Sequence, residues 1–82
     1  MNEIKILGLY VSSKIKDKAK LQNVLTKYGN VIRTRIGLNQ ENAAPGIILL
    51  ELFGDQEQIN YFERALTGIE GLEIQSMNFS GK

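Results

Sequence analysis

Strand-like and helix-like segments alternate along this chain in an order that few folds can accommodate. Four short apolar segments have the composition and two-residue periodicity of β-strands, at 4–11, 31–38, 46–53 and 72–78. Apolar residues with helical spacing follow the first of these segments, over 17–28, and the third, between Asp55 and Gly68. The resulting βαββαβ order is that of the split βαβ, or ferredoxin-like, α+β fold.

Both predicted helices carry an apolar stripe and recognisable start signals. The stripe residues recur at intervals of three and four, at Leu21, Val24, Leu25 and Tyr28 and then at Ile59, Phe62 and Leu66. Asp17 or Ser13 can cap the first helix, and Asp55 with Gln58 resembles a capping box for the second. Right-handed crossovers then place both helices on one face of a four-stranded antiparallel sheet.

With two layers, each strand has one face toward the helices and one open face. The most regular apolar alternation is assigned to the helix side, at Leu7, Leu9, Val11, Ile32, Ile36, Leu38, Ile48, Leu50, Leu52, Leu72 and Ile74. The open face then comprises Ile4, Ile6, Tyr10, Val31, Arg33, Arg35, Ile47, Leu49, Glu51, Phe53, Glu73, Gln75 and Met77. An open face is normally polar, and this one is about half apolar, so the pattern predicts a homo-oligomer, a dimer or tetramer, that covers it. Assembly is not required if one strand has the opposite register, or if a bulge at Gly8 exchanges its faces.

The predicted ligand-binding or interface site lies on two neighbouring strands. Arg33 and Arg35 are two residues apart, so they are expected to point the same way and to bind an anion, a carboxylate ligand or acidic residues of a partner. The alternative is a cross-strand ion pair. Gly37 permits close approach of a ligand or backbone, or marks a bulge. Ile47 and Leu49 on the next strand complete the predicted site.

The residue inventory excludes several classes of function. The 82 residues include no Cys and no His, which removes disulfides, thiol and imidazole metal sites, Cys nucleophiles and His bases. No catalytic residue, metal site or cofactor is therefore predicted. A net charge of +1 argues against direct nucleic-acid binding, and the longest apolar run, 47–50, is too short to span a membrane. The chain has no signal-peptide pattern, and we expect one cytoplasmic domain over 1–82.

Turn glycines and apolar segments of this chain also resemble those of a known family. They are Tyr28-Gly29-Asn30-Val31-Ile32, Arg35-Ile36-Gly37, Gly46-Ile47-Ile48-Leu49-Leu50, Gly54 and Ile69-Glu70-Gly71-Leu72. The pattern is similar to that of the small stand-alone iron-only hydrogenase system regulators. These proteins belong with ACT-like domains and with the C-terminal domain of the nickel regulator NikR. The resemblance extends over residues 4–76.

The resemblance implies a homo-oligomeric, non-catalytic regulatory domain, transcriptional or metabolic, that senses a small effector of unknown identity. Nickel sensing does not carry over, because NikR binds nickel through His and Cys and this chain has neither. Amino-acid-binding ACT domains usually have a glycine in the loop after the first strand, and the loop at 12–16 has none. The alternative function is an adaptor that holds a different protein on the apolar open face without a small-molecule ligand.

Overall fold

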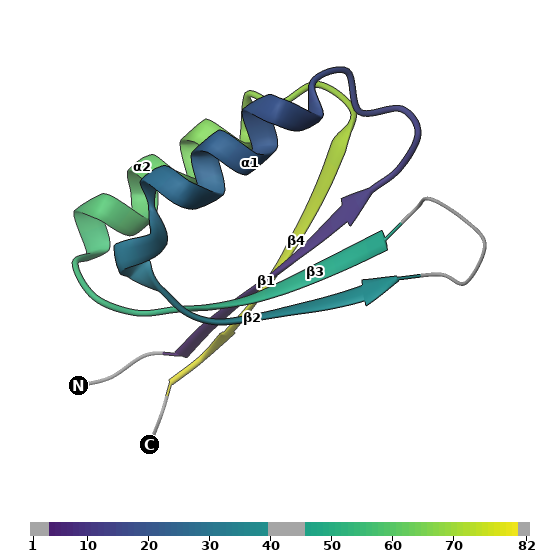
Figure 1. Ribbon diagram of the computed structural model, residues 1–82. Coiled ribbons are helices and arrows are strands. Elements are labelled where there is room, and N and C mark those ends of the chain that lie inside the picture. Colours follow the sequence, from purple (N-terminus) through teal and green to yellow (C-terminus); the bar gives the residue numbers. More distant parts are fainter. Residues whose placement is uncertain (1–3, 40–45, 81–82) are drawn as a thin grey trace.

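The computed structural model describes residues 4–39 and 46–80 of the chain. The elements are, in order, β1 (Ile4–Val11), α1 (Lys18–Lys27), the 3₁₀ turn η1 (Gly29–Val31), β2 (Ile32–Asn39), β3 (Gly46–Leu52), α2 (Gln56–Thr67) and β4 (Leu72–Phe79). The strands pair antiparallel in one sheet of order β2-β3-β1-β4, and both helices lie on the same side of it (Figure 1). The predicted ferredoxin-like α+β fold is confirmed. The connection between the predicted strands 31–38 and 46–53 lies outside the described residues from residue 40 onward.

Aspartate side chains fix the start of both helices. The Asp17 carboxylate accepts a hydrogen bond from the Lys20 backbone N–H at 3.0 Å, so Asp17 and not Ser13 caps α1. The Asp55 carboxylate accepts from the Glu57 N–H at 3.1 Å at the start of α2. These bonds satisfy backbone donors that have no partner within the helix.

The core lies between the helices and one face of the sheet. Its buried residues are Leu7, Leu9, Ile15, Leu21, Leu25, Val31, Leu50, Leu52, Ile59, Phe62, Leu66 and Ile69. The rings of Tyr28 and Phe62 pack with their centroids 5.4 Å apart, as expected for residues between helices. Tyr61, the neighbour of Phe62 in the sequence, is exposed on the outer side of α2. Val31, predicted on the open face, is buried in η1.

A bulge in β2 changes which of its residues face the helices. Pairing between β2 and β3 shifts between Ile32 and Thr34. Ile32 lies opposite Leu52 and packs against the core, as predicted. One extra residue on a strand exchanges the faces of every residue beyond it.

The residues after the bulge therefore have the opposite orientation to the predicted one. Ile36 and Leu38, predicted on the helix side, lie opposite Leu49 and Ile47 on the open face. Arg35 and Gly37, predicted on the open face, lie opposite Leu50 and Ile48 on the helix side. These placements were wrong because the bulge follows Ile32 directly. The bulge considered at Gly8 does not occur, since β1 pairs with β3 and β4 without a shift.

Candidate functional site on the open face of the sheet

The face of the sheet opposite the helices is the candidate functional site, and we call it the open face. Residues directly opposite one another on paired strands share a face. The open face therefore comprises Ile4, Ile6, Gly8, Tyr10, Thr34, Ile36, Leu38, Ile47, Leu49, Glu51, Glu73, Gln75, Met77 and Phe79. Both edge strands, β2 and β4, contribute to it (Figure 1).

Large apolar side chains are concentrated on the open face. Six of its positions carry apolar side chains that are 40–53% exposed: Ile4, Tyr10, Ile36, Leu38, Met77 and Phe79. Phe53 directly follows β3, is 40% exposed and continues the same alternation. Among the described residues, the remaining large apolar side chain of comparable exposure is Tyr61 on α2. So uneven a distribution is typical of a surface that another molecule covers.

The charged groups of the open face are acidic. Thr34 Oγ1 donates a hydrogen bond to Glu51 Oε1 at 2.8 Å, and Gln75 Nε2 donates to Glu73 Oε2 at 3.2 Å. Neither Lys nor Arg occupies any of the positions assigned above to this face. A molecule that covers the face must therefore accommodate two carboxylates within an apolar surface.

The residues of the predicted site do not all lie on the same face of the sheet. Ile47 and Leu49 lie together on the open face. Arg35 and Gly37 are exposed on the other side of the edge strand, and a Cβ built on Gly37 has no atom within 4 Å. Arg33 lies in the bulge, with its guanidinium 4.7 Å from the centre of the Phe53 ring. The two arginines therefore do not form one anion site, and their predicted cross-strand ion pair with glutamate is not found among the described residues.

A hollow lies on the open face above Gly8. It has a volume of about 390 Å³ and is lined by Gly8, Leu9, Tyr10, Ile47, Glu73 and Gln75. Tyr10 lies opposite both Ile47 and Glu73, so these side chains form one end of the hollow. Because Gly8 has no side chain, its backbone forms the floor of the hollow.

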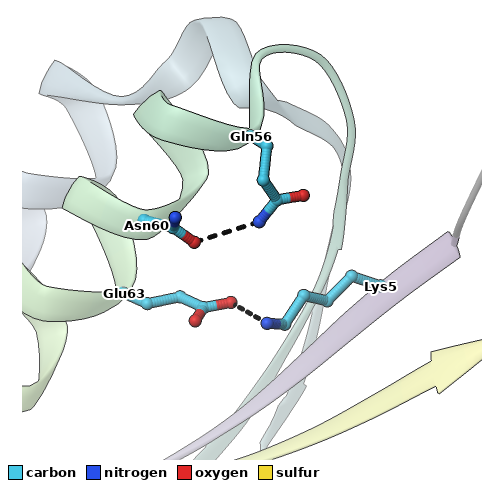
Figure 2. A network of polar contacts seen from close by, with 4 residues as sticks. All are labelled: Lys5, Gln56, Asn60 and Glu63. Carbon is cyan, nitrogen blue, oxygen red and sulfur yellow. Dashed lines mark hydrogen bonds and ion pairs between the residues drawn. The ribbon is translucent and has the colours of Figure 1, made fainter.

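A second cavity lies at the end of the sheet where β1 begins and β3 ends. Its volume is about 820 Å³, and its polar lining includes Lys5, Arg33, Glu51 and Gln56. Figure 2 shows that Lys5 Nζ is already paired with Glu63 Oε2 on α2, next to a 3.0 Å hydrogen bond from Gln56 to Asn60. Because its lysine is paired within the chain, this cavity offers a ligand less charge than its lining residues suggest.

Metal-ligand geometry and membrane-spanning helices are not found in the described part of the chain. No group of three or more Asp or Glu side chains within 4–39 and 46–80 is arranged to hold a metal ion. No helix formed by those residues has the length and hydropathy needed to cross a bilayer.

Solved structures with the same fold provide the comparison. No protein-family model and no curated protein matches the chain. The uncharacterized protein TM1266 from Thermotoga maritima superposes with a TM-score of 0.80 at 21% identity, over 96% of this chain and 100% of that protein. These values establish a shared fold.

Two enzymes match more distantly. A formyltetrahydrofolate deformylase from Pseudomonas putida KT2440 gives a TM-score of 0.53 at 10% identity, over 90% of this chain but 28% of the deformylase. SnoaB, a cofactor-independent oxygenase from Streptomyces nogalater, also gives 0.53, at 8% identity over 100% of this chain and 95% of the oxygenase. At such identities, only the fold is shared, and a single fold supports many functions.

Sequence reasoning missed several residues of the open face. Ile36 and Leu38 were assigned to the core because their alternation with Ile32 is unbroken in the sequence. Phe79 lies one residue beyond the predicted end of the last strand. The available signal was the apolar character of all three residues, and for Ile36 and Leu38 this character does not determine the face without the position of the bulge.

Proposed function

We propose that this chain is a non-catalytic regulatory domain that acts as a homo-oligomer, with the open face covered by a second copy. The apolar open face is the observation that carries the proposal. The same resemblance to iron-only hydrogenase system regulators that suggests regulation also suggests a small effector. The absence of Cys and His supports a role without catalysis.

The size of the open face is sufficient for self-association. A sheet of four strands, spaced about 4.8 Å apart and about 26 Å long, presents roughly 500 Å² per copy. Two stacked copies would bury roughly 1,000 Å², which reaches the lower limit of a specific interface. Stacked sheets lie about 10 Å apart with interdigitating side chains, so the open faces of two copies can form a second core.

A second copy is the preferred partner for two reasons. Most soluble oligomers are symmetric homo-oligomers, in which the same patch meets itself. Apolar side chains also reach both edges of the open face, at Ile36 and Met77, so a two-fold arrangement can bring apolar surface together at both edge strands. A different protein covering this face, the adaptor alternative, would meet the same two carboxylates, Glu51 and Glu73, for which the open face of a second copy supplies no Lys or Arg.

The mass of the purified chain in solution tests the proposal. Light scattering at micromolar concentration is expected to give at least twice the chain mass of 9.2 kDa, with no other protein present. A mass of one chain across the micromolar range would contradict the homo-oligomer. One chain bound to a different protein would contradict it too and would support the adaptor.

A further inference from the structure

Gly8 is a glycine that the fold itself does not require. It lies within β1, between β3 and β4, where a glycine weakens a strand. Among the described glycines, Gly54 and Gly71 have a positive φ angle and Gly8 does not, so its backbone conformation does not require glycine. A Cβ built on Gly8 would meet Leu49 Cδ2 at 3.6 Å and the Gln75 carbonyl oxygen at 3.9 Å, which are ordinary contacts. A larger residue would therefore fit the backbone, but it would fill the hollow above it.

The hollow has the shape and lining of a small-ligand site. The backbone at Gly8 and Leu9 forms its floor, the Ile47 side chain gives it an apolar wall, and Tyr10 lies at the same end as Ile47. A volume of about 390 Å³ lies within the range of small-molecule sites. Apolar walls with a few polar groups are typical of such sites.

The polar groups of the hollow select the charge of a ligand. Glu73 carries a carboxylate whose Oε2 accepts a hydrogen bond from Gln75 Nε2, and no Lys or Arg lines the hollow. The carboxylate attracts a cation and repels an anion. The other carboxylate of the open face, Glu51, adds negative charge. An apolar or aromatic ligand with an ammonium end therefore matches both the walls and the charge.

We infer that the hollow over Gly8 binds a small apolar amine, with its ring over Gly8 and against the Tyr10 and Ile47 side chains and its ammonium group at Glu73. The inference rests on the proposed function, because a second copy stacked on the open face closes the hollow from above. Glu73 is exposed and next to the start of β4, so this end of the hollow remains open at the rim of the stacked sheets.

The probe for the site is 2-phenylethylamine, with 2-phenylethanol and phenylacetate as its neutral and anionic counterparts. An NMR titration of the full ¹⁵N-labelled chain is expected to show saturable shifts of the Gly8, Tyr10 and Gln75 amides with the amine, in the millimolar range or tighter. The alcohol is expected to bind about fivefold more weakly and phenylacetate more weakly still. No saturable shift with the amine, or equal binding of phenylacetate, would overturn the inference.

Substitutions at Gly8 and at Glu73 test separately the space in the hollow and its negative charge. Gly8→Val is expected to abolish binding, and Gly8→Ala, which adds a single methyl group, to weaken it while the fold is retained. Gly37→Val is the control, because it introduces the same side chain on the helix side of β2, away from the hollow. This variant is expected to bind the amine like the natural chain. Glu73→Gln is expected to lower affinity for the amine about fivefold without changing that for the alcohol. Unchanged binding by folded Gly8→Ala and Gly8→Val would overturn the inference.

Light scattering on the same samples separates this inference from the proposed function. An oligomer that does not bind the amine overturns the inference and leaves the homo-oligomer intact. A monomer that binds the amine at Gly8 overturns the homo-oligomer and the closure of the hollow by a second copy, and it supports the ligand site itself.

Discussion

Gly71→Ala is expected to destabilise the chain by about 4 kcal/mol, a large share of the stability of a small domain. Gly71 has a φ of +89°, which a residue with a side chain rarely adopts. A Cβ at this position would lie 2.2 Å from the Lys14 carbonyl oxygen and 2.8 Å from Ile15 Cα. Because these atoms belong to the backbone, rotation of a side chain cannot relieve the overlap.

The loop between β1 and α1 must move to accept the alanine. That movement breaks the 3.2 Å hydrogen bond from the Lys16 N–H to the Glu70 carbonyl oxygen and pulls Ile15 out of the core. Urea unfolding followed by circular dichroism measures the loss. Gly37→Ala, with no atom within 4 Å of its Cβ, is the control and should change stability little. Equal midpoints for the two variants would show that the close approach of Gly71 to the loop is not required.

Leu49→Glu is expected to weaken assembly at least about 100-fold. Leu49 lies on β3 within the open face, directly opposite Gly8 of β1 and Ile36 of β2. In a stacked pair its side chain would be buried, so the substitution places an unpaired carboxylate in an apolar interface. Light scattering over a concentration series, or analytical ultracentrifugation, measures the change in dissociation constant.

Two further variants identify the cause of a loss of assembly. Ile36→Glu changes a side chain that is 49% exposed on the same face, so it leaves the monomer folded and should also dissociate the oligomer. Tyr61→Glu introduces the same charge at an exposed apolar residue of α2, outside the open face, and should keep the natural mass. If Leu49→Glu and Ile36→Glu retain the oligomer while Tyr61→Glu loses it, the interface lies on the helices.

The fold was predictable because each element carries its own signal. The stripes at Leu21 and Leu25 and at Ile59, Phe62 and Leu66 are buried as their spacing indicates. The aspartate caps at both helix starts are local features that require no knowledge of the rest of the molecule. The order of elements then leaves few topologies for an antiparallel sheet.

The faces of β2 were not predictable, because they depend on pairing with another strand. Ile32, Ile36 and Leu38 alternate without interruption, and the bulge that separates them exists only in the register with β3. Ile15 and Ile69 were missed as core residues because each lies in a connection, where periodicity gives no signal. The correction increases the apolar character of the open face, since Ile36 and Leu38 replace two positions that Arg35 and Gly37 were expected to occupy.

Contacts between methyl groups of different copies test the open-face interface most directly. In a mixed sample of ¹³C-labelled and unlabelled chains, an isotope-filtered NOE experiment detects only contacts between copies. We predict intermolecular contacts from the methyl groups of Ile36, Leu49 and Met77, and none from Leu21 or Leu66 in the core between the helices and the sheet. An oligomer without intermolecular contacts from the three open-face residues would contradict the account.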